Sequence, residues 1–210
     1  MKLPRLVAGS VVYPLQERAF GRPTFDYLAD LERSQWLSRG NVEALQFAKL
    51  RRLLVTAHSQ SPWHRARMEA AGLRPDHLDS MADLQRLPTM TKADAALHRD
   101  RLVWLGVPGG AFRYNTGGSS GQPLIFYFGR WRQASDAAGR MRARRWWGVE
   151  PGDPEAYLWG APVELNKTDR IKTLRDRLVN QLVLNAFAMS APRMDDYLTT
   201  LKAWQPKCLY

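Results

Sequence analysis

The chain has 210 residues, of which 45% are apolar, and it carries a net charge of +11. This size and apolar content allow one large globular domain or two small ones with a hydrophobic core. The longest uncharged run near the start, residues 6–16, contains Pro14 and falls far short of the roughly 20 residues of a membrane helix, so no membrane span is predicted. A single cysteine, Cys208, excludes an internal disulfide framework and predicts a cytoplasmic location.

The excess of basic residues favours acidic partners. Lys and Arg number 31 against 20 Asp and Glu, and such a balance attracts nucleotides or acidic surfaces through the long-range electric field. The positive charges are scattered over several segments, and no contiguous basic face is evident from the sequence. A nucleic-acid partner is therefore not expected.

The first hundred residues are predicted to be mainly helical. Residues 1–23 contain three prolines and predict an irregular lead-in. Thr24 caps a predicted helix that stops near Gly40, and Asn41 caps a longer one that runs to about Ser59. The apolar face expected for that longer helix consists of Leu50, Leu53, Leu54 and Ala57. Two further short helices are expected, one opened by Pro62 and one capped by Thr91.

After residue 100 the pattern changes to alternating strands and helices. Compact apolar runs rich in β-formers predict strands at 102–105, 124–128, 156–159, 182–184 and 207–210. Helical periodicity is expected at 130–147, 168–180 and 190–204. This alternation indicates parallel βαβ units and the α/β class. We therefore expect a helical region over 1–100 and an incomplete α/β nucleotide-binding domain over 101–210, in a protein that is truncated.

The most informative stretch is a glycine- and hydroxyl-rich loop between two β-favouring segments. Its candidate ligand-binding residues are Thr116, Gly117, Gly118, Ser119, Ser120, Gly121 and Pro123. Glycine lets the backbone approach a ligand closely, while amide N–H groups and hydroxyls supply donors to an oxyanion such as phosphate. The same residues also build ordinary turns that bind nothing, so the loop alone leaves both interpretations open.

Three functional interpretations compete for this loop. A Walker-type phosphate loop requires Lys and then Ser or Thr after the last glycine, followed by a helix, whereas Gln122, Pro123 and a β-run follow here. A hydrolase nucleophile elbow matches G-x-S-x-G at 117–121, but an elbow lies between a strand and a helix and its histidine comes later in the chain. All four histidines precede Ser119. The remaining interpretation is a hydroxyl-rich phosphate clamp within a β-hairpin.

The loop and its flanks together resemble the phenylacetate-CoA ligase family of adenylate-forming enzymes. The loop is similar to the phosphate loop of that superfamily, and the flanking segments follow in the family's order. Those segments are Gln35-Trp36-Leu37-Ser38, Ser61-Pro62-Trp63-His64-Arg65, Leu87-Pro88-Thr89-Met90-Thr91-Lys92, Leu158-Trp159-Gly160 and Gln205-Pro206-Lys207-Cys208-Leu209-Tyr210. The last two also resemble segments of the capsule-biosynthesis (CapK-like) and deazaflavin-coenzyme adenylyltransferase relatives. The resemblance covers nearly the whole chain.

This resemblance implies a two-step ligase with ATP, Mg²⁺ and coenzyme A. A small-molecule carboxylate would attack the α-phosphate of ATP to give an acyl-adenylate and pyrophosphate, and a thiol would then take the acyl group. Thr116, Ser119 and Ser120 would supply hydroxyls to the β- and γ-phosphates, the three glycines would allow close backbone approach, and Pro123 would fix the exit. The position after Pro123 is Leu124, where many relatives have lysine. The segments that carry the family's later catalytic residues are not in this chain, so no catalytic residue is assigned.

Other candidate residues carry weaker signals. The histidines show no metal-ligand spacing, so no metal site is predicted. Tryptophans at 104, 146, 147 and 159 could line an acyl pocket or belong to the core, and the basic segment 167–177 could contact coenzyme phosphates or face solvent. The alternatives to a ligase are a non-catalytic binding or interaction module and, more weakly, a basic nucleic-acid binder.

Overall fold

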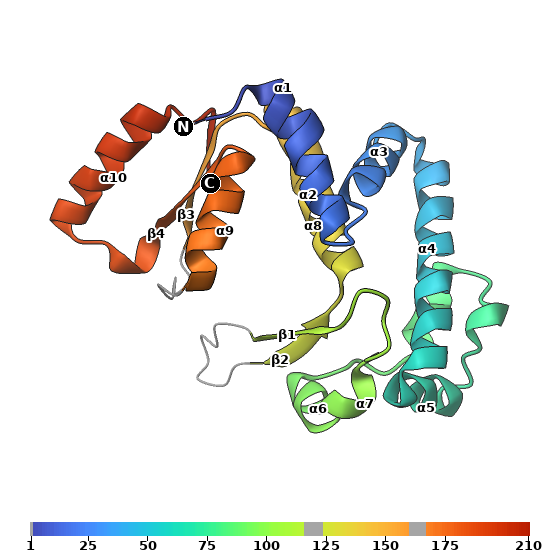
Figure 1. Cartoon of the computed structure of the whole chain (residues 1–210). Helices are drawn as coiled ribbons and strands as arrows, with labels where there is room; N and C mark the ends of the chain where they lie inside the picture. The colour runs from blue at the N-terminus through green and yellow to red at the C-terminus, as the bar shows by residue number, and fades with distance from the viewer. Residues whose placement is uncertain (1, 116–123, 160–166) are drawn as a thin grey trace. The chain divides into compact units, whose positions relative to one another are not determined.

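The computed structural model describes residues 2–115, 124–159 and 167–210 (Figure 1). It divides into two compact units, which we name by their β-structure. The sheet unit comprises Met1–Leu31 and Ala134–Tyr210, and the hairpin unit comprises Glu32–Gln133. The sequence predicted instead a boundary between residues 100 and 101, and this division into domains stays a prediction.

The sheet unit begins with a helical segment, which corrects the irregular lead-in expected from sequence. This segment consists of α1 (Arg5–Val7), a π-helical turn η1 (Ala8–Val12) and α2 (Tyr13–Ala19). The backbone stays helical from α1 through η1 into α2, and Pro14 follows the π-helical turn, where a helix can adjust locally to a residue without an N–H donor. The three prolines therefore do not prevent helix formation in this segment. Pro4 precedes α1, Pro14 follows η1, and Pro23 precedes the helix that begins at Thr24.

The sheet itself has three parallel strands in the order β4-β3-β5. Strand β3 (Glu155–Trp159) lies between β4 (Gln181–Asn185) and β5 (Cys208–Leu209), with Ala156 opposite Leu182 and Leu209. The connections run through α9 (Lys167–Leu178), the 3₁₀ turn η4 (Ala186–Ala188) and α10 (Ala191–Trp204). The parallel βαβ arrangement and the α/β class predicted from sequence are thus confirmed.

Two apolar clusters hold the sheet unit together. Helix α10 packs Tyr197, Leu201 and Trp204 on the face of the sheet that carries Ala156, Leu182 and Leu184, and Figure 1 shows α9 on the other side of the strands. The second cluster joins α3 (Thr24–Ser34) to α8 (Arg130–Arg145) through Leu28, Ala138 and Met141. The small Ala138 side chain, fully buried, lets the two helices approach closely.

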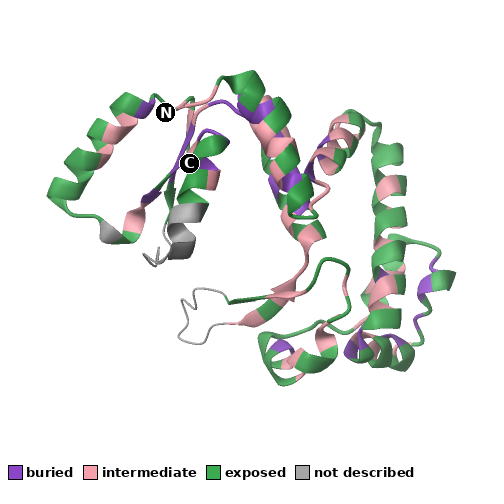
Figure 2. Cartoon of the chain, viewed as in Figure 1, coloured by how far each residue is buried: buried purple, intermediate pink, exposed green. Residues whose placement is uncertain are grey.

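The hairpin unit is mainly helical, as expected for most of its length. Its helical elements are α4 (Arg39–Gln60), α5 (Pro62–Ala70), η2 (Pro75–His77), η3 (Met81–Arg86), α6 (Lys92–Leu97) and α7 (Arg99–Leu102). Helix α4 exposes most of its surface (Figure 2) and buries Leu54 against Met68, Leu73 and Leu78. Leu53, expected on the same face, is exposed instead. The unit therefore has a small core along a narrow stripe of α4.

Local capping explains where these helices begin. Ser38 accepts a hydrogen bond from the Asn41 amide, so α4 starts two residues before the predicted cap. Thr91 and Asp94 form a reciprocal capping box at the start of α6, as the Thr91 prediction requires.

The predicted strand at 102–105 is wrong. Leu102 ends α7, and the Val107 amide donates to the Trp104 carbonyl, which closes a turn. An apolar run forms a strand only when a neighbouring strand pairs with it, and none of the described strands pairs with this segment.

Candidate functional site

The candidate loop connects the strands of an antiparallel hairpin in the hairpin unit. Strand β1 (Phe112–Asn115) pairs with β2 (Ile125–Phe128), and the last pair before the loop is Asn115 with Ile125. The hairpin expected around the loop is therefore confirmed, and β2 follows the loop where a Walker loop or nucleophile elbow requires a helix. The candidate residues Thr116, Gly117, Gly118, Ser119, Ser120, Gly121 and Pro123 lie outside the described residues.

Aromatic side chains gather on one face of this hairpin. The Tyr114 ring packs edge-to-face against Phe126 and at a tilt against Phe128, with ring centroids 5.4 and 5.5 Å away. Because cross-strand pairs on one face interact directly, these rings stabilise the register of the two strands. The guanidinium of Arg130, in the first turn of α8, lies 4.3 Å from the ring centroid of Phe112. The hairpin that carries the loop is thus held by side-chain packing as well as by backbone hydrogen bonds.

A cavity of about 360 Å³ lies beside β2 within the hairpin unit. Its walls come from α5, α6, α7, the segment after α7, and residues 124–129. Trp104, which the sequence offered as a pocket residue, lines this cavity together with Leu102 and Val103. The apolar run read as a strand therefore forms a cavity wall.

Among the described residues that line the cavity, the ionisable ones are the two basic residues His64 and Arg99, and Tyr127. Burial, helped by the nearby positive charge of Arg67, lowers the pKa of His64, so its imidazole is neutral near pH 7. The buried Nε of Arg99 has no hydrogen-bond partner in the described part of the chain. Its carboxylate neighbour is Asp100, whose Oδ1 lies 3.6 Å away on a side chain that is 90% exposed. Such an exposed pair contributes little, and Arg99 is the fixed positive charge of the cavity.

Ser61 fixes the wall that carries His64. Its Oγ accepts a hydrogen bond from the His64 amide and donates one to the Arg101 carbonyl, 3.1 Å away. The cap of α5 is thereby tied to α7. The ring of Trp63 contacts those of His64 and His98, with centroids 5.1 and 5.8 Å away. These contacts position the part of the cavity wall that carries His64.

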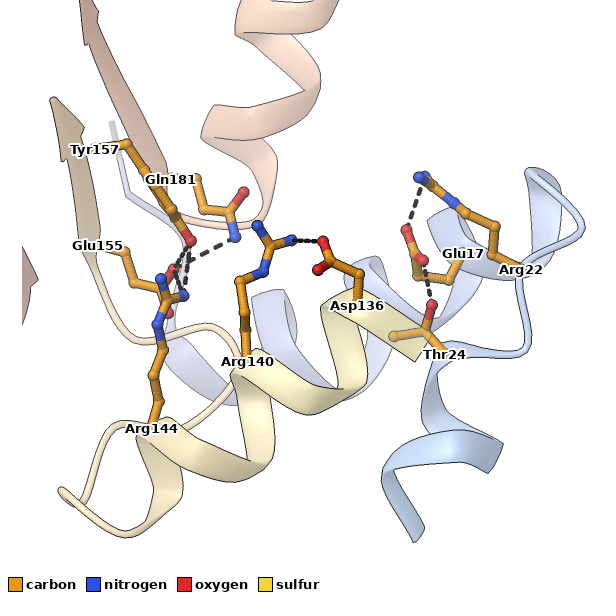
Figure 3. A network of polar contacts seen from close by, with 9 residues as sticks. All are labelled: Glu17, Arg22, Thr24, Asp136, Arg140, Arg144, Glu155, Tyr157 and Gln181. Atoms are coloured by element: carbon orange, nitrogen blue, oxygen red, sulfur yellow. Dashed lines mark hydrogen bonds and ion pairs between the residues drawn. The ribbon is translucent and has the colours of Figure 1, made fainter. Parts of the chain in front are cut away.

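A second polar cluster, in the sheet unit, surrounds the buried carboxylate of Glu155 (Figure 3). Arg144 donates to Glu155 Oε2 and to the Tyr157 hydroxyl, each at 2.7 Å, and Gln181 Nε2 donates to Glu155 from 3.4 Å. Burial, followed by the charge of Glu155, raises the pKa of Tyr157 above its usual range. Burial alone lowers the pKa of Arg144, but Glu155 and Tyr157 outweigh it, so the net direction is upward.

The role of this cluster is to join α8 to the sheet. Glu155 already has a cation at contact distance, and the cavity beside the cluster has only about 20 Å³, which leaves no room for a ligand. Sequence reasoning missed the cluster. The available signal was Glu155 and Tyr157 two residues apart in an apolar strand, which places both side chains on one face.

The other tryptophan candidates are not among the residues that line the cavity. Trp146, Trp147 and Trp159 are exposed. Within the described ranges, no group of three or more His, Cys, Asp or Glu side chains is placed to hold a metal ion. Over the same residues, no helix has the length and hydropathy of a membrane span.

Comparisons with known proteins show a shared fold. No protein-family model and no curated protein matches the sequence. Solved structures of 2-hydroxyisobutyryl-CoA ligase do match. The open conformation in complex with 2-HIB-AMP and CoA gives a TM-score of 0.62 at 18% identity, over 83% of this chain and 41% of that one. The postadenylation state in complex with R3-HIB-AMP gives 0.60 at 20% identity, over 83% and 37%.

The low sequence identity and the partial coverage limit the comparison to the fold. At 18–20% identity the likeness establishes the fold, and this chain spans 37–41% of the length of the two ligases. The chain therefore has the α/β fold of part of a CoA ligase, with a helical N-terminal region followed by the first part of the layered sheet.

Proposed function

We propose that this chain is the N-terminal part of an adenylate-forming carboxylate–CoA ligase, of the kind represented by the phenylacetate-CoA ligase and CapK-like family. The observation that carries the proposal is the β1–β2 hairpin, which pairs up to Asn115 and Ile125 and connects through the Thr/Ser/Gly loop. The fold shared with 2-hydroxyisobutyryl-CoA ligase supports the same conclusion.

In this function the loop binds the β- and γ-phosphates of ATP. Successive amide N–H groups and the hydroxyls of Thr116, Ser119 and Ser120 donate hydrogen bonds to phosphate oxygens. When the carboxylate substrate attacks the α-phosphate, negative charge develops on the pyrophosphate leaving group. Donors held in place before the reaction stabilise this charge without reorganising, which lowers the barrier to acyl-adenylate formation. Coenzyme A is the proposed acceptor of the acyl group.

Mg²⁺ belongs to this proposal only as the counter-ion of ATP. The described strands of the hairpin, residues 112–115 and 125–128, contain no carboxylate, and Mg²⁺ is held in proteins mainly by carboxylates, phosphates and water. We therefore assign no Mg²⁺ ligand to this chain and derive no step through the metal.

The loop can be tested by calorimetric titration of the 210-residue chain with pyrophosphate and with ATP. We expect weak binding, and the double variant Ser119→Ala, Ser120→Ala should weaken it by about tenfold or more, because each hydrogen bond to a charged group contributes about 1.5–3 kcal/mol. Ser59→Ala is the matched control, since the Ser59 hydroxyl lies in α4 and donates to the Thr56 carbonyl. Equal pyrophosphate affinity in the double variant and the parent would overturn the proposal.

The catalytic part of the proposal has its own assay. In a complete enzyme that carries this chain, the same double variant should sharply lower carboxylate-dependent exchange of pyrophosphate into ATP. Exchange that is unchanged by the double substitution contradicts the assignment. No exchange with any carboxylate in the parent protein would instead favour the non-catalytic binding module.

A further inference from the structure

The N-terminal helical segment of the sheet unit, from α1 through η1 to α2, exposes its apolar side chains. Its buried face carries small and polar residues, Ala8, Gly9 and Glu17. Four aliphatic side chains, named here the aliphatic stripe, are exposed instead: Leu6 by 66%, Val7 by 42%, Val11 by 51% and Leu15 by 59%. The last three follow at intervals of four residues, which places them on one side of a helix.

Packing of the buried face fixes this orientation. A Cβ at Gly9 would overlap the Pro151 carbonyl, so the helix approaches this segment backbone to backbone. Glu17 pairs with Arg22 at 2.8 Å and accepts a hydrogen bond from the Thr24 hydroxyl. Rotating the helix to bury the stripe would break both contacts, so the stripe stays exposed in the folded unit. Contiguous apolar surface of this kind is typical of interaction sites.

The exposed charges along this segment are basic. Between residues 2 and 20 they belong to Arg5 and Arg18, which lie roughly 20 Å apart if each residue adds about 1.5 Å along the axis. A carboxylate beside the stripe is already neutralised, because Glu150, which lines a groove with Arg5 and Leu6, pairs with Arg145 at 2.8 Å. The stripe therefore has a positive charge at each end.

These charges argue against a second copy of the chain as the partner. In a two-fold pair of antiparallel helices, Arg5 of one copy would face Arg18 of the other, and in a parallel pair each arginine would face its own equivalent. Like charges would meet in both arrangements. A lipid surface, in contrast, accepts an aliphatic ridge without a complementary pocket, which a protein partner would have to supply.

We propose that residues 5–19 lie on an anionic membrane surface, with the aliphatic stripe at the acyl boundary and Arg5 and Arg18 at the phosphate headgroups. Helices that lie in the membrane interface combine an apolar face with basic residues in this way. The net charge of +11 on the whole chain adds long-range attraction to such a surface. The proposal does not depend on nucleotide binding, so its test and the pyrophosphate titration succeed or fail independently.

The test is flotation of the 210-residue chain with vesicles of phosphatidylcholine alone and of phosphatidylcholine with about one third phosphatidylglycerol. We expect the chain to float with the anionic vesicles and not with the neutral ones, because a short aliphatic face needs electrostatic attraction to stay at the surface. Raising the salt concentration should weaken the binding, since salt screens exposed charges.

One pair of variants tests the stripe. Val11→Gln combined with Leu15→Gln should weaken binding to the anionic vesicles at least about tenfold, because two aliphatic side chains no longer leave water. The matched control is Met194→Gln combined with Leu198→Gln, which changes two exposed apolar residues four positions apart on α10. This control should bind as the parent chain does.

A second pair separates local charge from net charge. Arg5→Gln combined with Arg18→Gln should weaken binding by more than about tenfold, because each basic residue at an anionic surface contributes about fivefold. Arg193→Gln combined with Lys202→Gln removes the same charge from exposed side chains of α10 and should have a smaller effect.

Hydrogen exchange on the parent chain keeps the test decisive if a variant fails to fold. With anionic vesicles, peptides that cover residues 5–19 should exchange more slowly, while peptides that cover 191–204 should not change.

Several results would overturn the proposal. Absence of binding to the anionic vesicles is one, and it is expected if another part of the protein covers the stripe. Equal binding to neutral vesicles is another, and so is a control variant with the effect of its counterpart. A dimer in solution that Val11→Gln with Leu15→Gln dissociates would assign the stripe to a second copy instead.

Discussion

Replacing Arg144 with alanine removes the positive partner of a buried carboxylate in the sheet unit. The side chains of Arg144 and Glu155 are only 14% and 9% exposed, and their charged atoms lie 2.7 Å apart. Without Arg144, the Glu155 carboxylate keeps its hydrogen bonds from Tyr157 and Gln181 but loses its counter-ion. We expect the sheet unit to lose stability.

The size of this loss follows from burial. Breaking a buried ion pair by removing one partner costs about 3–5 kcal/mol, because an uncompensated charge remains away from water. One turn earlier on α8, Arg140 pairs with Asp136 at 3.8 Å, and these side chains are 44% and 45% exposed. An exposed pair of this spacing contributes about 0.3–0.5 kcal/mol. Arg144→Ala should therefore destabilise the unit several times more than Arg140→Ala.

The assay is native-state amide hydrogen exchange, followed by mass spectrometry on peptides that cover β3 and β4. It reports the free energy of opening of the sheet unit without requiring the two units to unfold together. Adding Glu155→Gln to Arg144→Ala should recover part of the loss, since the buried charge is then gone. The reasoning is refuted if Arg144→Ala costs less than about 1 kcal/mol, or if Arg140→Ala has an equal effect.

Three further predictions concern the same unit. Gly152 has φ +87°, and a Cβ there would lie 2.5 Å from Arg5 O and from Gly9 N, so Gly152→Ala should destabilise the unit by about 2 kcal/mol or more. Gly139→Ala in α8, where a Cβ meets no atom within 4 Å, should stabilise it by about 0.5–1 kcal/mol; equal thermal shifts for the two variants would contradict this. Because the pKa of Tyr157 is raised in the folded state, its contribution to stability is full below the unfolded pKa of about 10 and is lost as pH rises through the folded pKa. An alkaline titration of tyrosine absorbance in the parent and in Tyr157→Phe checks this. The difference between the two curves is the titration of Tyr157, and its midpoint should lie above the ordinary tyrosine pKa. A midpoint at about pH 10 would refute the prediction.

Much of the fold could be predicted from local sequence signals. The helix cap at Thr91 can be predicted from sequence because capping is a local interaction. In the structure the Thr91 hydroxyl accepts a hydrogen bond from the amide three residues later, so no distant partner is needed. The strands at 156–159 and 182–184 were recognised from short apolar runs bounded by turn residues. The hairpin was predicted because two β-favouring runs flank a glycine-rich loop.

Two predictions from sequence were wrong, the strand at 102–105 and the irregular segment at 1–23. In both cases the same local sequence is compatible with more than one structure. Residues 102–105 are compatible with a strand, but none of the described strands pairs with them, and Leu102, Val103 and Trp104 line a cavity instead. Pro14 would interrupt a regular helix, but here it follows a π-helical turn within a continuous helical segment, and such a turn changes the local hydrogen-bond pattern. Neither the cavity wall nor the helical structure around Pro14 can be predicted from these short segments alone.

The sequence by itself determined the helical first part of the chain, the alternation of strands and helices after it, and the candidate phosphate loop with its hydroxyl and glycine residues. These depend on capping, periodicity and turn chemistry, which act over a few residues. Only the tertiary structure decided that Arg99 and Trp104 share a cavity with β2, and that Arg144 neutralises Glu155 from another element. Those placements depend on which apolar faces pack together, and charge and hydrogen-bond partners follow from that packing over long separations in the chain.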